Sequence, residues 1–280
     1  MPEGPEVARQ ADEIRAAIAP GPRPSAVEVW FGLERLEPWA EVLSGRKVRR
    51  VRARGKAFLI EFGPAREPLT LYAHLQLAGK WIVVGPGEGP PETTRSLRVR
   101  LASRGGTALL YSASEVEVLR PAELAEHSYL AGLGPDVLGD LDLAGVRARL
   151  REPSFGRSSL AGLYLRQDFL AGLGNYLRSE ILHHAKLHPD RRLGDLSAAE
   201  LRRLAQSTYD LPRRSYETGG ITNPARRAAR LQAEGVPYRS TRWWVFEREG
   251  EPCYRCQRPV QRIQRGSRRL YLCEGCQPPG

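Results

Sequence analysis

The stretch EVEVLRPAEL, residues 115–124, marks the change that decides the fold. Its first half alternates apolar and acidic side chains, as a half-buried strand does. Short β-branched or aromatic runs separated by Gly- and Pro-rich breaks predict further strands before it. These are AVEVWF (26–31), RKVRRVRA (46–53), KAFLIEF (56–62), LTLYAHLQL (69–77), KWIVV (80–84), LRVRLA (97–102) and TALLYS (107–112). After it, Leu- and Ala-rich stretches that end in Gly or Pro predict helices over about 121–231.

The order of these patterns predicts an α+β fold. A helix begins the chain, because apolar residues recur there every three to four positions and Pro20 ends the run; they are Val7, Ala11, Ile14 and Ile18. An antiparallel β-sandwich, a helical domain and a cysteine-rich segment follow. The expected domains are 1–120, 121–235 and 236–280.

The composition indicates a polyanionic partner. The 280 residues carry a formal charge of +11, which favours nucleic acid over a merely solvated basic surface. Only four of the 43 basic residues are lysines, and arginine suits bidentate phosphate binding. No signal-peptide pattern or membrane-spanning apolar run is seen, so we expect a cytoplasmic protein with no membrane partner.

Two CxxC pairs, Cys253/Cys256 and Cys273/Cys276, predict a four-thiolate zinc ribbon. One Zn²⁺ bound by four thiolates has no open coordination position, so its role would be structural. The loop between the pairs carries five arginines, which indicates either a solvated hairpin or a phosphate-binding finger; they are Arg258, Arg262, Arg265, Arg268 and Arg269.

Two shorter motifs indicate phosphate contacts. RQDFLAGLGNYLRSEILHHAKLHP (166–189) predicts a helix, a tight glycine turn and a second helix with Asn175 near its start. Backbone N–H groups at such a helix N-terminus bind phosphate, although many helical hairpins contain glycine for other reasons. Lys56 lies in a turn between two strands and is either a solvated charge or a phosphate ligand.

Four motifs in one order resemble the family of formamidopyrimidine-DNA glycosylase and endonuclease VIII: MPEGPE at residue 1, RGK at 54–56, GLGNYLRSEIL at 172–182 and the C-terminal ribbon. The resemblance covers essentially the whole chain. It implies a bifunctional DNA glycosylase and abasic-site lyase of base excision repair, with a helix-two-turn-helix in the helical domain. The implied partner is double-stranded DNA that contains oxidised bases or abasic sites, bound by a monomer in the bacterial nucleoid.

The resemblance implies that Pro2 is the nucleophile once Met1 is removed. An α-amino group has a pKa of about 7.7–8, so a fraction is neutral and nucleophilic near neutral pH. Attack at C1′ of the damaged nucleotide would expel the base and form a Schiff base, from which β- and δ-elimination cut the strand. Glu3 is the expected acid–base partner and Glu6 a second carboxylate that positions water or protons.

The remaining site residues follow from the same motifs. Lys56, Asn175 and the backbone at Gly174 would hold phosphates beside the extruded nucleotide, and the finger arginine Arg268 would bind flanking phosphates. Because the nucleotide must leave the stack, a void filler is expected, and YAHLQLAG (72–79) resembles that segment of endonuclease VIII. Gln76 and Leu77 are the expected fillers. Further DNA-binding candidates are His74 and Arg269.

The chain resembles the bacterial endonuclease VIII branch more than the formamidopyrimidine branch. It has no Met in the filler segment, which favours oxidised pyrimidines over 8-oxoguanine or formamidopyrimidines. It departs from endonuclease VIII at Ala78, where an aromatic residue is expected to take part in reading the opposite base. The alternative functions are a non-catalytic binder of damaged DNA and a zinc-ribbon module for RNA binding or transcription.

Overall fold

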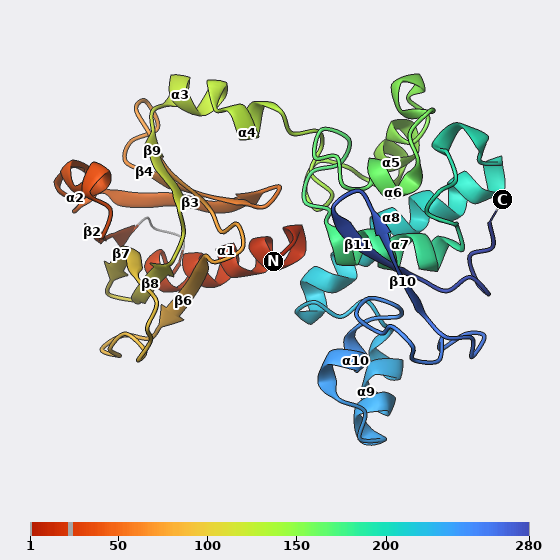
Figure 1. Ribbon diagram of the computed structural model, residues 1–280. Helices are drawn as coiled ribbons and strands as arrows, with labels where there is room; N and C mark the ends of the chain where they lie inside the picture. The colour runs from red at the N-terminus through yellow and green to blue at the C-terminus, as the bar shows by residue number, and fades with distance from the viewer. Residues whose placement is uncertain (1, 22–24, 280) are drawn as a thin grey trace. The chain divides into compact units, whose positions relative to one another are not determined.

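The computed structural model describes residues 2–21 and 25–279, and these form two compact units (Figure 1). The β unit contains Pro2 and Val7–Gly132. The helical unit contains Glu3–Glu6 and the chain from Leu133 onward. No helix in the described part of the chain combines the length and apolar character that a bilayer-spanning helix requires.

Two antiparallel sheets make up most of the β unit, which confirms the predicted sandwich. The first sheet has the order β1-β3-β4-β5-β9 and the second the order β2-β7-β8-β6. Their bounds are β1 Ser25–Ala26, β2 Glu28–Phe31, β3 Lys47–Arg54, β4 Ala57–Phe62, β5 Leu69–His74, β6 Lys80–Val84, β7 Leu97–Ser103, β8 Gly106–Tyr111 and β9 Glu115–Leu119.

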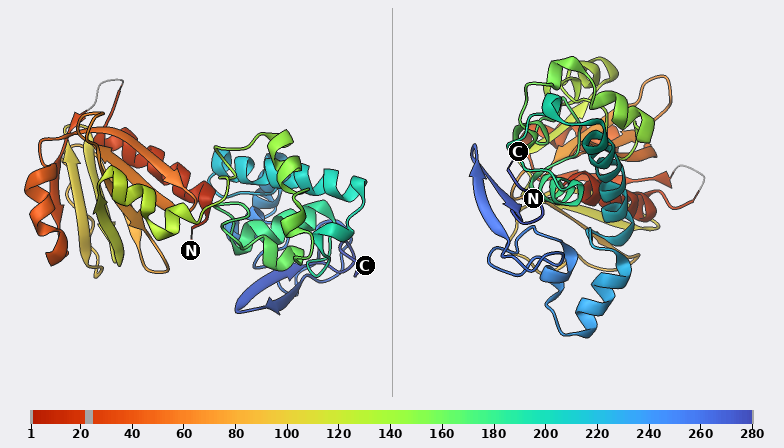
Figure 2. Two further views of the ribbon diagram at one scale, coloured as in Figure 1. Left: turned by 90° about the horizontal axis from the view of Figure 1, so that it is seen from above. Right: turned by 90° about the vertical axis from the view of Figure 1, so that its right-hand side faces the viewer.

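The predicted N-terminal helix is α1, Gly4–Ile18, and its apolar stripe lies in the core of the sandwich. Val7 and Ile14 share one buried cluster with Phe58 of the first sheet and Leu110 of the second. In Figures 1 and 2 the helix runs alongside both sheets. Burial of these side chains, at about 25 cal/mol per Å² of apolar surface, fixes a terminal helix that would fray alone.

The structure differs from the predicted strands in three places. The predicted strand 26–31 is divided between β1 of the first sheet and β2 of the second. Residues Glu34–Leu36 form a 3₁₀ turn (η1) and Glu37–Leu43 a helix (α2), where only strands were predicted. Pro38 lies in the first turn of α2, where it is tolerated. Strand β5 ends at His74, so the expected strand over 69–77 is too long. Gln76 adopts a left-handed backbone with φ 49°, which a strand cannot contain.

Helices dominate after β9, as predicted. Their bounds are α3 Pro121–Glu126, α4 Ser128–Ala131, α5 Leu143–Arg149, η2 Pro153–Phe155, α6 Leu160–Leu163, α7 Asn175–Ala185, η3 Leu193–Asp195, α8 Ala198–Thr218, α9 Ala225–Ala233 and α10 Tyr238–Arg242. A capping box formed by Ser197 and Glu200 begins α8, and Gly219 ends it in a left-handed conformation. The hairpin of β10 (Gln261–Arg265) and β11 (Arg268–Leu272) comes last.

The helix before the glycine turn is shorter than its Leu pattern suggests. It is the single turn α6, and the chain from 164 to 174 contains no helix. Leu170 and Leu173 are nevertheless fully buried. The amide side chain of Gln167 holds this segment, because it donates to the carbonyls of Leu165 and Leu173 and accepts from Gly172 N–H. Local hydrogen bonds therefore replace the expected helix.

The two compact units divide the chain differently from the three expected domains. Helices α3 and α4 belong to the β unit, where Leu124, Tyr129 and Leu130 pack on Ala57 and Leu59. The C-terminal hairpin belongs to the helical unit, because Leu270 and Leu272 enter the core that Leu177 and Ile181 of α7 occupy. Residues 236–280 as a separate domain stay a prediction.

Candidate active site

Glu3 forms the N-terminal cap of α7, a helix that begins more than 170 residues later. Its buried carboxylate accepts the N–H of Tyr176 on one oxygen, at 2.8 Å, and the N–H of Leu177 on the other, at 3.2 Å. These are two of the four N–H groups that a helix leaves unpaired at its start. The carboxylate also lies at the positive end of the helix dipole, where a negative charge is stabilised.

Glycines in the GLGN turn make room for this contact. A Cβ at Gly174 would lie 2.4 Å from the Glu3 carboxyl carbon, so any side chain there would displace the carboxylate. Gly4 N–H donates to the carbonyl of Gly172 at 2.8 Å, and a Cβ on Gly4 would lie 3.0 Å from Gly172 Cα. Gly172 itself has φ 96°, which favours glycine. The glycines of this turn therefore provide the space that residues 3 and 4 occupy.

Whereas α7 binds the side chain of Glu3, Glu6 binds its backbone. Its Oε2 accepts the N–H of Glu3 at 3.0 Å, which is the backbone half of a capping box, and the hydroxyl of Tyr176 at 3.1 Å. Its Oε1 lies 3.9 Å from an Arg242 nitrogen. Burial raises the pKa of Glu6 above its ordinary 4.5, and the bond from Tyr176 opposes this shift.

The phosphate site predicted at the start of α7 is partly used by the protein itself. The N–H groups of Tyr176 and Leu177 bind Glu3, as described above. The Asn175 Oδ1 lies 3.4 Å from a guanidinium nitrogen of Arg178. A phosphate role for Asn175 and for the backbone at Gly174 stays a prediction.

Arg178 connects the start of α7 with the finger hairpin. Its guanidinium is fully buried, and it donates to the carbonyls of Ala161 at 2.8 Å and Arg269 at 2.9 Å. Burial lowers its pKa to about 10. Arg268 and Arg269 themselves are exposed at the beginning of β11. Their side chains are thus presented by a strand whose backbone is bonded to α7.

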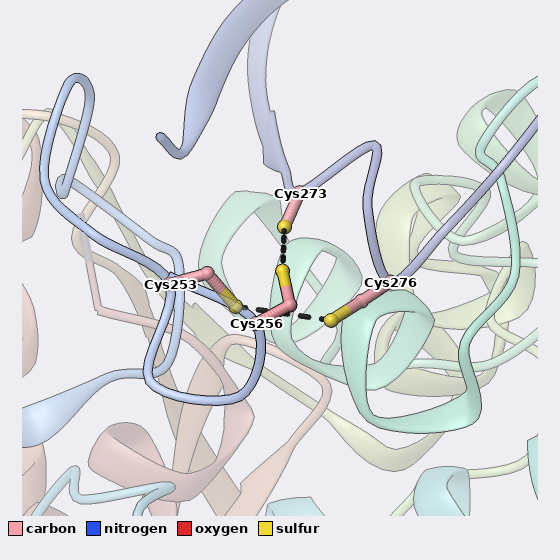
Figure 3. A group of neighbouring side chains, drawn as sticks. All are labelled: Cys253, Cys256, Cys273 and Cys276. Carbon is pink, nitrogen blue, oxygen red and sulfur yellow. Dashed lines mark hydrogen bonds between the residues drawn. The ribbon is translucent and has the colours of Figure 1, made fainter. Parts of the chain in front are cut away.

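The four cysteines lie together at the base of the hairpin (Figure 3). Their sulfur atoms all lie within 4.8 Å of one another; Cys256 Sγ is 3.3 Å from Cys273 Sγ, and Cys253 Sγ is 3.8 Å from Cys276 Sγ. Tetrahedral Zn²⁺ with bonds of about 2.3 Å separates sulfurs by about 3.8 Å. The donor set and its spacing therefore fit a metal ion with four thiolate ligands.

A second group of predicted residues lies in the β unit. Lys56, in the turn between β3 and β4, is 8% exposed, and its N–H donates to the hydroxyl of Tyr129 at 3.1 Å. A lysine is almost never so buried on a solvated turn. His74 packs edge-on against Tyr129, with ring centres 5.0 Å apart. Burial lowers the pKa of His74; Glu115 opposes this shift and Lys56 adds to it.

The predicted void fillers lie on a tight turn between β5 and β6. Leu77 at its tip is 83% exposed. Gly79 N–H donates to the carbonyl of Leu75 at 2.7 Å, and a Cβ on Gly79 would lie 2.7 Å from that same oxygen, so a glycine is required where the turn closes. The carbonyl of Ala78 accepts Arg95 Nη1 at 2.6 Å. Ala78 thus has a backbone role in place of the expected aromatic side chain.

Comparison with known proteins decides the family. Residues 1–114 match the family model of the formamidopyrimidine-DNA glycosylase N-terminal domain. Endonuclease 8 of Shigella sonnei is 45% identical and that of Escherichia coli K12 44% identical, each over 99% of this chain and 100% of the relative. The chain belongs to the formamidopyrimidine-DNA glycosylase and endonuclease VIII family. The resemblance seen in the sequence is thereby confirmed.

Solved structures of this family share the fold. Lactococcus lactis Fpg in complex with DNA containing N7-benzyl-Fapy-dG aligns with a TM-score of 0.77 at 22% identity, over 99% of this chain and 100% of that one. The same protein in complex with DNA containing an abasic site gives a TM-score of 0.74 at 21% identity, with the same coverage.

The sequence analysis did not identify one buried carboxylate of this protein. Glu180 of α7 is fully buried and accepts the backbone N–H groups of Trp244 and Val245 at 2.9 Å and of Phe246 at 3.0 Å. Burial raises its pKa, and these bonds oppose the shift. A glutamate within a buried helix (NYLRSEIL) was the available signal. Through these hydrogen bonds, Glu180 joins α7 to the segment that leads into the cysteine cluster.

Proposed function

We propose that the protein is a bifunctional DNA glycosylase and abasic-site lyase of base excision repair that uses Pro2 as its nucleophile. One observation carries most weight: Glu3, the neighbour of Pro2, is held by two backbone N–H groups of α7. A solvated N-terminal tail would need neither a buried carboxylate nor a glycine turn that leaves room for that carboxylate. Membership of the family, whose curated members here are named endonuclease 8, supports the same conclusion.

The chemistry begins with the secondary amine of Pro2 after removal of Met1, which lies outside the described residues. The nitrogen attacks C1′, the bond to the base breaks, and the base leaves with the electron pair and a proton. The C1′–O4′ bond of the sugar then breaks, its electron pair stays on O4′, which takes up a proton, and the nitrogen is left double-bonded to C1′ as an iminium. This iminium makes the C2′ protons acidic. Loss of one of them expels the 3′ phosphate, and a second elimination expels the 5′ phosphate.

Glu3 is the proposed acid–base residue. It would protonate the sugar ring oxygen during attack and move the elimination protons afterwards. Glu6 would serve as a second carboxylate that positions water or protons, since its pKa is raised by burial. Its bonds to Glu3 N–H and to the Tyr176 hydroxyl also keep Glu3 in place.

Basic side chains in both units are proposed to bind duplex DNA around the lesion. Lys56, Asn175 and Gly174 would hold phosphates beside the extruded nucleotide, with His74 nearby in the β unit. Arg268 and Arg269, exposed on the finger, would hold flanking phosphates, and Gln76 and Leu77 would fill the vacated space. We further propose that the protein acts at the nucleoid as a monomer.

The metal of the cysteine cluster is proposed to be one structural Zn²⁺. Four thiolates satisfy its tetrahedral preference and leave no position for a reactant, so the ion would stabilise the finger. The His183 ring lies 3.6 Å from Cys253 Sγ, and burial lowers the pKa of this histidine to about 3. A neutral His183 with its proton on Nε2 can donate a hydrogen bond to the Cys253 thiolate.

Oxidised pyrimidines are the proposed preferred lesions, because Leu77 occupies the turn where the formamidopyrimidine branch uses a methionine. Retained preference for 8-oxoguanine or formamidopyrimidines is the alternative. A non-catalytic binder of damaged DNA is disfavoured, because binding alone does not require the Glu3 arrangement.

Borohydride trapping tests the proposal. The protein is incubated with duplexes that contain dihydrouracil or 8-oxoguanine, the iminium is reduced, and the cross-linked peptide is mapped. We expect an adduct on Pro2, formed faster with dihydrouracil. Pro2→Gly and a variant that retains Met1 should lose base excision but keep DNA binding. Full excision with Met1 retained, or no adduct on either duplex, would overturn the assignment.

A further inference from the structure

The turn that carries Leu77 has a backbone that needs support. Gln76 has φ 49°, in the left-handed region that residues other than glycine rarely adopt. Such a conformation costs on the order of 1 kcal/mol and persists only where neighbouring groups impose it. Leu77, the next residue, projects from the turn with 83% of its surface exposed. The direction of this side chain therefore depends on what holds Gln76.

Two side chains from neighbouring strands hold Gln76. Its backbone N–H donates to His74 Nδ1 at 3.2 Å, and its side-chain amide donates to Glu115 Oε1. Glu115 and His74 are direct partners in the antiparallel pairing of β9 with β5. Glu115 Oε2 approaches His74 Nδ1 to 3.8 Å, which is too far for a hydrogen bond, so Nδ1 remains the acceptor for Gln76.

The strand that carries Glu115 is itself fixed. Arg35 of η1 donates to the carbonyl of Val116 at 2.7 Å and lies 3.4 Å from that of Ser114, so one guanidinium holds the residues on both sides of Glu115. Glu117, two residues along the same face of β9, approaches His127 Nε2 to 3.6 Å. It is as exposed as Glu115, with 43% against 44% of its side-chain surface accessible.

We propose that Glu115 is a positioning residue for lesion extrusion: through Gln76 it holds the 75–79 turn in the shape that directs Leu77 into the DNA. The inference rests on the proposed function, in which Leu77 fills the space left by the extruded nucleotide. A turn already in its inserted shape avoids the entropy cost of ordering it on binding. Glu115 touches neither the reacting atoms nor the catalytic carboxylates in this assignment.

The test uses Glu115→Ala, with Glu117→Ala as a control of equal exposure on the same strand. Excision of dihydrouracil from duplex DNA should fall about five- to tenfold in kcat/KM for Glu115→Ala and remain unchanged for Glu117→Ala. Glu115→Gln retains an acceptor oxygen and should recover most of the rate. All variants are assayed at a temperature at which circular dichroism shows them folded.

Two further measurements separate positioning from a general defect. Cleavage of an abasic site in single-stranded DNA needs no void filler, so Glu115→Ala should leave its rate unchanged. In duplexes with 2-aminopurine opposite the lesion, the fluorescence rise that reports unstacking should be reduced in Glu115→Ala, as it is in Leu77→Ala. Adding Glu115→Ala to Leu77→Ala should have no further effect, because both changes act through one turn.

Several outcomes would overturn the inference. These are equal rates for Glu115→Ala and Glu117→Ala on duplex DNA, an equal loss on single-stranded abasic DNA, or additive effects with Leu77→Ala. Failure of the proposed function looks different: the unmodified protein would then cleave neither the duplex nor the single-stranded substrate.

Discussion

Gly174 determines whether Glu3 can reach the start of α7. The residue has an extended backbone with φ −149°, a conformation open to any amino acid, so the requirement for glycine comes from space alone. The nearest atoms to a new methyl group would be those of the Glu3 carboxylate. A single methyl group at this position thus tests the seating of Glu3 without changing Glu3 itself.

Gly174→Ala should reduce base excision at least about 100-fold, because a displacement of about 1 Å in a catalytic group has effects of this size. The thermal stability should fall less than for a core cavity, since no apolar contact is removed. Single-turnover excision and circular dichroism measure the two effects. Gly139→Ala, where a Cβ meets nothing within 4 Å, is the control and should retain full activity.

Glu6 should make the stability of the protein depend on pH. Burial raises its pKa, so the native state binds this proton more tightly than the unfolded chain, whose value is near 4.5. The stabilisation is complete below about pH 4.5 and is lost as the pH rises through the higher native pKa. Glu6→Gln removes this dependence. Its melting temperature relative to the parent protein should therefore rise as the pH is raised above about 4.5. A constant difference would contradict the assignment.

At the residue scale, the motifs single out candidate site residues but not their contacts, and the functional roles of these residues stay predictions. Pro2, Glu3 and Lys56 were identified from motifs, and the structure buries Glu3 and Lys56. The partner of Glu3 was not identified, because the GLGN turn indicates a phosphate site as readily as a carboxylate site. Only the fold brings residue 3 to residues 176 and 177.

Among the elements, helix α7 combines several buried charged groups. The Glu3 carboxylate binds the N–H groups at its start, and Arg178 and Glu180 are buried within it. Alternating patterns located most strands, because one face of each sheet is buried against the other. Helix α2 was missed, since its seven residues are too few to display a period against a background of strands. The end of β5 at His74 was missed, because the turn backbone at Gln76 depends on partners from other strands.

Removal of the Glu180 side chain should be costly. Glu180→Ala leaves three buried N–H groups without their acceptor, and we expect the helical unit to lose on the order of 3 kcal/mol of unfolding free energy. Glu200→Ala removes a half-buried capping-box residue of α8 and should cost about 1 kcal/mol. Chemical denaturation followed by Trp fluorescence compares them. Equal losses would show that burial of Glu180 has no special importance.

The finger should depend on its metal. We expect about one Zn²⁺ per chain, and Cys256→Ser should lose it together with most of the DNA affinity. The β unit, whose core includes no part of the hairpin, should keep its circular dichroism signal. Metal analysis and fluorescence anisotropy with a DNA probe measure both effects. Retained metal after the loss of a cysteine ligand would show that the four thiolates are not its site.

For the molecule as a whole, the charge of +11 predicts DNA affinity that falls steeply with salt. Arg268→Ala should reduce the slope of log K against log salt by about 0.9, which corresponds to one phosphate contact. Arg104→Ala removes an arginine of the β7–β8 turn that is also exposed, and it should leave the slope unchanged. Identical slopes for the two variants would show that the finger arginine is not a phosphate ligand.

The seating of Glu3 on α7 also has a consequence for biosynthesis. The hydrogen bond to Tyr176 joins residues 173 positions apart. Glu3, among the first residues to leave the ribosome, therefore cannot form this bond until α7 has been synthesised. At about 5–20 residues per second this interval is roughly ten to thirty seconds. A nascent or truncated chain that ends before α7 cannot hold Glu3 in place. Glu3, the proposed acid–base residue, therefore reaches its bonded position only after the first part of the helical unit has been synthesised.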